Sequence, residues 1–436
     1  PQFALPVAAT AILEQLFNAS DIAVVGNFSG AASTIAVAAV GANSFVISLV
    51  VNFFIGIALG ANVVIANAIG REDTDAVHRA VHTAVVVAVL GGALVTVLGE
   101  LVAGPALRAL NVPAEVLPYA LLYLRIYLLG VPVILLYNFE AAIFRSVGDT
   151  RVPLQTLAFS GVLNVLLNLF FVIVLHMTVN GVATATVLSN AISSVLLFVR
   201  LRRSDKAIHL EWTALRIDRR SLQKILQIGI PAGIQSAVFS ISNIVIQSAI
   251  NSLGTVVMAA SSAAFNIEVV AYDVLNSFSQ ACTTFVGQNY GAGKLDRCRK
   301  TLVLCLVEDA LASGIAILLV LGSGHFLLSL FNRDPEVIAL GYTRLMTVFT
   351  AYFFSMLYEV MSGYLRGFGI SLVPALLTML GVCGVRILWI ATAFPRSRTF
   401  QTILLAYPLS LAATAVLILL ALLIYHPSRR TKGETV

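Results

Sequence analysis

Long apolar runs alternate with short polar segments along the chain, and this pattern predicts its secondary structure. A helix needs about 20 residues to cross roughly 30 Å of hydrocarbon at about 1.5 Å per residue. Runs that meet this length occur at 3–27, 34–66, 80–104, 117–144, 153–175, 181–201, 225–251, 255–286, 301–322, 341–365, 372–394 and 402–425. The pattern therefore predicts an all-α polytopic membrane protein with twelve transmembrane helices.

The two halves of the chain repeat short motifs in the same order. The segment at 66–75 matches that at 287–296, and the segment at 144–148 matches that at 365–369, both at an offset of 221 residues. A nearly constant offset over several matches is typical of an internal duplication. Each half holds six spans, an even number, so both enter the membrane in the same orientation. We predict two six-helix lobes related by a pseudo-two-fold axis along the membrane normal, with a cleft between them.

This duplication predicts the domain boundaries. We place the amino-terminal lobe at 1–199, a cytoplasmic linker at 200–224, the carboxy-terminal lobe at 225–425 and a cytoplasmic tail at 426–436. The linker holds eight basic and three acidic residues. Such a stretch signals membrane topology, and a regulatory or lipid-headgroup role is the alternative.

The basic residues are distributed unevenly between the two sides of the membrane. If the amino terminus is cytoplasmic, the inside loops and tail collect twenty of the 27 Lys and Arg residues, including Arg429, Arg430 and Lys432. The outside loops receive Arg108, Arg333, Arg344, Arg396 and Arg398. This bias predicts that both termini are cytoplasmic. We expect the protein in a bacterial inner membrane.

Composition and motifs exclude several functional classes. Hydrophobic residues make up 59% of the chain and charged residues 11%, and the mean hydropathy is +0.94, which excludes a soluble protein. The net charge of +6 comes from loop residues and does not indicate nucleic-acid binding. The sequence contains no Walker A, HExxH or GxSxG motif. We therefore expect a protein that is not an enzyme, needs no cofactor and takes energy from an ion gradient or a partner protein.

Polar residues inside the first span suggest an ion site. Glu14, Asn18 and Asp21 lie at i, i+4 and i+7, which places them on one helix face. A carboxylate at the bilayer centre costs about 3 kcal/mol by insertion scales, so such acids usually face a bundle interior or a wet cavity. We interpret this stripe as a cation site. A paired structural carboxylate is the alternative.

The fifth and sixth spans add neutral oxygen atoms. Asn164 and Asn168 lie one turn apart on the fifth span and can face Asp21, while Thr186 on the sixth span is a further donor of oxygen. Together with Asp21 they form a candidate sodium site, and an interhelical hydrogen-bonded pair without ion binding is the alternative.

The carboxy-terminal half supplies candidate residues for a substrate cleft. Acidic and aromatic residues there can attract an organic cation through charge and through an aromatic face. Glu268 and Tyr272 share one helix face, and Glu359 directly follows Tyr358. The full predicted set comprises Gln235, Asn243, Gln247, Glu268, Tyr272, Asn276, Tyr358 and Glu359.

Several of these segments together resemble the multidrug and toxic compound extrusion (MATE) family. The resemblance rests on GlyGlnAsnTyrGlyAlaGly at 287–293, AspIle at 21–22, ArgSerValGlyAspThr at 145–150 and GlyIlePro at 229–231, and it covers essentially the whole chain. It implies an efflux carrier that expels organic cations in exchange for sodium ions or protons by alternating access. It also implies that Asp21 carries the coupling cation.

The sequence departs from the family at one position of the fifth span. The family often shows Asn-x-x-Leu-Asp, whereas this chain has AsnValLeuLeuAsn at 164–168. Asn168 thus replaces an acid, and a two-carboxylate ion site would require Glu14 as the second acid. We expect a proton or a single sodium ion as the coupling ion.

A flippase for lipid-linked substrates of the same superfamily is the rival function. Its anionic cargo would require basic residues in the cleft. The intramembrane charges are mostly acidic, which favours a cationic cargo. We therefore expect small organic cations and the lipid bilayer as partners, no nucleic acid, and a monomeric protein.

Overall fold

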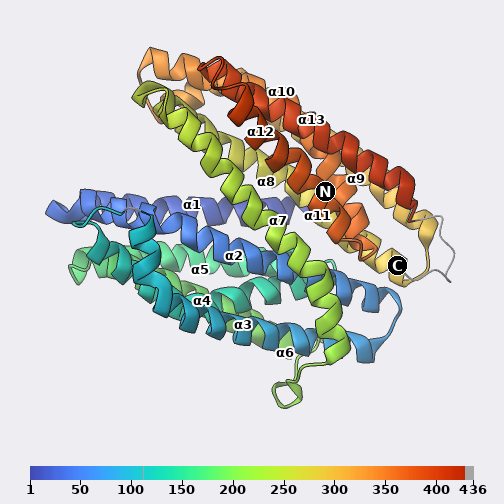
Figure 1. The fold of residues 1–436 in the computed structure, drawn as a ribbon. Coiled ribbons are helices and arrows are strands. Elements are labelled where there is room, and N and C mark those ends of the chain that lie inside the picture. The colour runs from blue at the N-terminus through green and yellow to red at the C-terminus, as the bar shows by residue number, and fades with distance from the viewer. Residues whose placement is uncertain (111, 428–436) are drawn as a thin grey trace. The chain divides into compact units, whose positions relative to one another are not determined.

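The described residues of the computed structural model form helices joined by short turns, with no strand among them (Figure 1). The structure describes residues 1–110 and 112–427, apart from the side chain of Phe45. The basic residues predicted for the tail, Arg429, Arg430 and Lys432, lie outside these ranges. The all-α prediction is thus confirmed for the described chain.

The helices follow the predicted spans closely. In the first half they are α1 (Ala4–Phe28), η1 (Gly30–Ala32), α2 (Ser33–Gly70), α3 (Thr74–Ala109), α4 (Leu117–Ser146), α5 (Arg151–Leu169), η2 (Phe170–Val174) and α6 (Val179–Arg202). In the second half they are η3 (Trp212–Ala214), α7 (Arg219–Asn251), α8 (Thr255–Gly291), α9 (Leu295–Ser329), α10 (Pro335–Gly367), α11 (Leu372–Thr378), η4 (Met379–Gly384), α12 (Val385–Thr392) and α13 (Phe400–Tyr425).

Eleven segments of the described chain are long and apolar enough to cross a membrane, and α1 completes the predicted twelve by length. With 25 residues α1 spans about 37 Å at 1.5 Å per residue. Its apolar composition is lowered by Glu14, Gln15, Asn18 and Asp21. Three of these residues, Glu14, Asn18 and Asp21, are also the predicted cation-site residues.

The described chain divides into two compact units. The amino-terminal unit comprises Ala9–Gly229, and the carboxy-terminal unit comprises Pro1–Ala8 together with the described residues from Ile230 onward. The division falls inside α7, a few residues after the predicted linker. The predicted lobe boundaries, which rest on the sequence repeat, stay predictions.

Small residues allow close helix packing in the amino-terminal unit. The α4 helix packs against α2, α3 and α6. Gly92 of α3 lies directly against the backbone of Pro132 in α4, and the Thr96 hydroxyl donates to the backbone oxygen of Leu128 over 2.6 Å. Short interhelical approaches of this kind strengthen packing where no water drives helices together.

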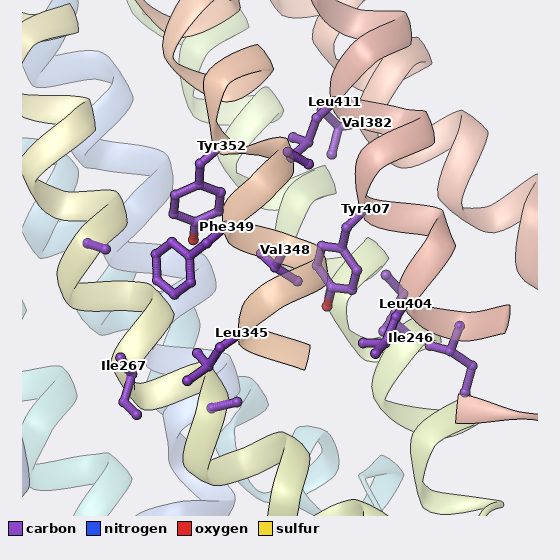
Figure 2. Packing of buried hydrophobic residues seen from close by; sticks show 14 of the residues in the cluster. Ile246, Ile267, Leu345, Val348, Phe349, Tyr352, Val382, Leu404, Tyr407 and Leu411 are labelled. Atoms are coloured by element: carbon purple, nitrogen blue, oxygen red, sulfur yellow. The ribbon is translucent and has the colours of Figure 1, made fainter. Parts of the chain in front are cut away.

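The carboxy-terminal unit is built around α10, which packs against α8, α9 and α13. Its largest buried cluster draws Ile267 from α8, Val348 and Tyr352 from α10, and Tyr407 and Leu411 from α13 (Figure 2). These side chains fix α10 in the centre of the unit and thereby position the polar residues that it carries.

Two arginines that the sequence analysis assigned to loops are buried in α10. Arg344, predicted in an outside loop, is 2% exposed, and Arg366, predicted in an inside loop, is 7% exposed. Arg344 already falls within the predicted span 341–365, and Arg366 follows its last residue directly, so both lie inside α10. The loop assignments were wrong because partners on neighbouring helices, Glu268 for Arg344 and Gln235 for Arg366, allow these side chains to be buried. The helix extends past the apolar run at both ends.

Candidate functional site

Asp21 is buried in the amino-terminal unit and bonded to two neighbouring helices. It is 5% exposed on α1. Asn168 of α5 donates from Nδ2 to Asp21 Oδ1 over 2.5 Å, and the Thr186 hydroxyl of α6 lies 3.0 Å from Oδ2. The predicted meeting of Asp21, Asn168 and Thr186 is thus present in the structure.

Further amide and hydroxyl groups extend this network between α5 and α6. Asn168 donates to Asn164 Oδ1 over 3.2 Å, and Asn164 donates to the Ser189 hydroxyl over 3.3 Å. Asn164 and Asn168 share one face of α5, so one helix face supplies two members. The side-chain oxygen of Asn168, Oδ1, is buried and has no hydrogen-bond partner in the described chain. An unsatisfied oxygen beside a buried carboxyl marks a place where another polar species can bind.

The charge of Asp21 has no fixed counter-ion. No basic side chain of the described residues forms an ion pair with it. A buried carboxylate without a cation is costly, and it becomes stable when it takes up a proton or a small cation.

The other two residues of the predicted stripe are not bonded to Asp21. Asn18 is exposed. Glu14 is half-buried and interacts electrostatically with Tyr137 and Arg145 of α4. The structure thus brings Glu14 toward a basic residue and gives Asp21 a separate environment.

Glu268 is already paired with an arginine. Arg344 Nε lies 2.7 Å from Glu268 Oε1 and Arg344 Nη2 lies 2.8 Å from Oε2, a bidentate pair between α10 and α8. The guanidinium also donates to Ser261 Oγ over 2.5 Å and to Tyr407 Oη over 3.2 Å. In this arrangement the charge of Glu268 is neutralised within the unit.

Glu359 and Tyr272 form a second polar pair. The Tyr272 hydroxyl donates to Glu359 Oε1 over 2.8 Å, joining α8 to α10. Glu359 is 3% exposed, Tyr358 beside it is buried, and Asn276 is half-buried. Tyr272 was predicted to act with Glu268, but its bonding partner is Glu359, because it lies one turn further along α8.

The polar residues predicted on α7 divide into one buried and two exposed positions. Gln235 is buried and its Oε1 accepts from Arg366 Nη2 over 2.9 Å. Asn243 is exposed, and the exposed Gln247 donates to Asn251 of its own helix over 2.7 Å. Gln235 is thus connected with α10, whereas Asn243 and Gln247 lie on an exposed face of α7.

Sequence reasoning missed the role of Arg344 and did not locate the partners of Arg386. Arg386 is 4% exposed, donates from Nε to Ser410 Oγ over 3.0 Å, and lies 4.5 Å from the ring centre of Tyr407 and 5.9 Å from that of Phe239. The only available signal was an arginine within an apolar run, which identifies a buried cation but not its partner.

Comparisons with known proteins agree with this architecture. The MatE family model matches residues 6–170 and again 231–391. The chain is 26% identical over 394 residues to "Probable multidrug resistance protein YoeA" of Bacillus subtilis (strain 168), covering 88% of this chain and 84% of that protein. It is 27% identical over 411 residues to "Probable multidrug resistance protein NorM" of Thermotoga maritima, covering 92% and 85%.

The fold is also that of a solved transporter. The structure titled "Outward-facing conformation of a multidrug resistance MATE family transporter of the MOP superfamily" covers 99% of this chain and 96% of its own with a TM-score of 0.90, at 19% identity. The family match extends over most of the chain and occurs once in each half. This chain is therefore an integral membrane transporter of the MatE family.

Proposed function

We propose that this chain is a secondary active efflux transporter that exchanges organic cations for protons by alternating access, with Asp21 as the coupling residue. The observation that carries the proposal is the burial of Asp21 among neutral donors without a basic partner. Such a carboxyl changes its charge when it binds or releases a cation, and that change is what a gradient-driven carrier must use.

The surroundings of Asp21 support a proton rather than a sodium ion. The Thr186 hydroxyl has one hydrogen and lies 3.0 Å from both Asp21 Oδ2 and the backbone oxygen of Val182. When that hydrogen points to Val182, the hydroxyl oxygen accepts a proton held by Asp21. Asn168 presents its nitrogen to Asp21, whereas a bound sodium ion would require the amide oxygen.

The positive charge of the proposed cargo is inferred from side chains of the carboxy-terminal unit. Glu359 is a buried acid whose described side-chain partners are the neutral hydroxyls of Tyr272 and Tyr358, and it forms no ion pair with a described basic residue, so its charge is available to an organic cation. The aromatic face of Tyr272 adds attraction for the same charge. We further propose that the protein works as a monomer in a bacterial inner membrane with both termini in the cytoplasm.

A flippase or exporter of anionic cargo is the second candidate function. The observation in its favour is Arg386, a buried cation whose described hydrogen-bond partner is Ser410 and which forms no ion pair with a described acid. A buried guanidinium is well suited to bind a carboxylate or phosphate.

One transport experiment tests the coupling residue and the cargo class together. Purified wild type and Asp21→Asn are placed in liposomes with a proton gradient or a sodium gradient, and a cationic and an anionic fluorescent dye are offered separately. We expect wild type to move the cationic dye under the proton gradient and Asp21→Asn to lose this movement while still binding the dye. Gradient-driven transport by Asp21→Asn at the wild-type rate would refute the coupling role, and preference for the anionic dye would favour the second candidate.

A further inference from the structure

A second acid is buried in the amino-terminal unit, and the site described above does not use it. Glu140 of α4 is 0% exposed. The Ser194 hydroxyl of α6 donates to Glu140 Oε2 over 3.0 Å. The other carboxyl oxygen, Oε1, is buried and has no hydrogen-bond partner in the described part of the chain.

The helices around Glu140 offer no cation that pairs with it. The α2 helix contains no titratable side chain, and α5 and α6 carry theirs only at their ends. On α3, His82 is held by the backbone oxygen of His78 and by Glu211. The remaining groups near this part of α4 are Tyr137, Arg145 and Glu14, and none of them forms a described ion pair with Glu140.

This environment favours the neutral acid. An ionised carboxylate held by one hydroxyl in a dry interior lacks the several hydrogen bonds or the counter-charge that offset its desolvation. A carboxylic acid needs only one acceptor and one donor, and it is far cheaper to bury. The geometry of Glu140 thus matches a carboxyl group that holds a proton.

Polar side chains line the contact between α5 and α6 from Asp21 toward Glu140. We define the α5–α6 seam as Ser160, Asn164 and Asn168 of α5 with Thr186, Ser189 and Ser193 of α6. Each helix contributes members at successive turns, so these polar positions extend over about 12 Å at 1.5 Å per residue, and the described hydrogen bonds among them form two groups, one from Asp21 to Ser189 and one that joins Ser160 to Ser193. Asp21 lies at the Asn168 end. At the other end Ser193 is bonded to Ser160 and is followed directly by Ser194, which holds Glu140.

We propose that Glu140 is a second proton-binding residue of the amino-terminal unit and that it exchanges its proton with Asp21 through the seam. The inference rests on the proposed coupling role of Asp21. In the exchange the O–H bond of Glu140 breaks as its proton passes to a seam hydroxyl or a water molecule, and the Thr186 hydroxyl gives its proton to Asp21 Oδ2 while it takes another from the next hydroxyl or water. Glu140 is left as the carboxylate and Asp21 as the acid, every hydroxyl and water regains one proton, and the amides of Asn164 and Asn168 position the groups without exchanging protons.

Two substitutions at Glu140 separate a proton-carrying role from a structural one. Glu140→Gln keeps the side-chain size and an oxygen that can accept the hydrogen bond from Ser194, but it cannot titrate. Glu140→Asp keeps a titratable carboxyl group, but its shorter side chain no longer fills the same space. We expect Glu140→Gln to lose proton-driven dye transport and its pH dependence, and Glu140→Asp to retain part of both. A structural role predicts the reverse order, with Gln close to wild type and Asp impaired.

The exposed loop residue Glu115 provides a matched control, because Glu115→Gln makes the same chemical change outside the spans. Infrared difference spectra between high and low pH add a direct readout. We expect a carboxylic acid band in wild type that shifts with ¹³C-labelled glutamate and disappears in Glu140→Gln but persists in Glu115→Gln. Absence of that band from wild type would overturn the inference.

Asp21→Asn in the same assay separates this inference from the function it rests on. If Asp21→Asn transports normally, the proposed coupling residue is wrong whatever Glu140 does. If Asp21→Asn is inactive while Glu140→Gln retains the wild-type transport rate and pH profile, only the role of Glu140 is refuted.

Discussion

At the scale of single residues, the pairing of Glu268 with Arg344 changes what the acid can do. Both carboxylate oxygens accept hydrogen bonds from the guanidinium, and both side chains are buried. Removing one partner of a buried pair leaves an uncompensated charge, which costs about 3–5 kcal/mol. Glu268 therefore contributes to the architecture of the carboxy-terminal unit, and its role in attracting cargo stays a prediction.

We predict that Glu268→Gln lowers the thermal stability of the purified protein strongly, and that Glu268→Met combined with Arg344→Met recovers most of the loss. The midpoint of heat-induced aggregation in detergent measures this. Glu100→Gln is the matched control, because its pair with Arg125 is partly exposed and such pairs contribute less than about 1 kcal/mol. A Glu268→Gln protein as stable as wild type would contradict the prediction.

The same residues show how far sequence reasoning reaches. The meeting of Asp21 with Asn168 was predictable, because each lies in a polar stripe on an otherwise apolar helix and such stripes must face one another. The partners of Arg344 were not, because Glu268 and Tyr407 are 76 and 63 residues away and only the packing of α10 between α8 and α13 brings them together. Local periodicity predicts which face of a helix is buried, but it does not predict which other helix packs against that face.

At the scale of helices, glycine determines how closely α2 and α7 approach in the amino-terminal unit. A Cβ atom at Gly60 would collide with the backbone oxygen of Ile225 and would lie 2.8 Å from the nitrogen of Gly229. In the same way a Cβ atom at Gly229 would lie 2.5 Å from Ile57 Cα. The obstacle on both sides is backbone, which cannot move aside as a flexible side chain can.

We predict that Gly60→Ala destabilises the protein, because the added methyl group forces two backbones apart. Gly41→Ala on the same helix is the control, since no atom lies within 4 Å of its Cβ position and alanine favours a helix over glycine by about 1 kcal/mol. Thermal midpoints of the two variants should move in opposite directions. Equal midpoints would show that the contact between α2 and α7 is looser than the structure indicates.

At the scale of the whole chain, duplication and hydropathy account for most of what the sequence predicted. The family model matches residues 6–170 and 231–391, in agreement with the offset found in motifs such as 66–75 and 287–296. The number and order of the helices follow from the bilayer, because every span must satisfy its backbone hydrogen bonds internally while it crosses the hydrocarbon. Loop positions of arginines such as Arg366 were less reliable, because α10 continues through Gly367, beyond the end of the apolar run.

Membrane topology gives a prediction at this scale. We expect a cysteine at Glu115 to react with a membrane-impermeant maleimide in intact cells and a cysteine at Asp205 to react only after the membrane is opened. The four native cysteines are buried, so the introduced thiol dominates the signal. Labelling of both positions in intact cells would refute the assignment of both termini to the cytoplasm.

The buried pair of Arg344 and Glu268 also bears on how the protein is made. The ribosome synthesises α8 before α10, so Glu268 enters the membrane before its partner exists. An arginine within a span costs free energy on insertion, up to about 2.5–3.5 kcal/mol at the helix centre, and the carboxylate of Glu268 offsets part of that cost when α10 arrives. The order of the helices along the messenger RNA therefore links the insertion of α10 to the earlier insertion of α8, and we expect a chain that lost Glu268 to insert in lower amount than wild type.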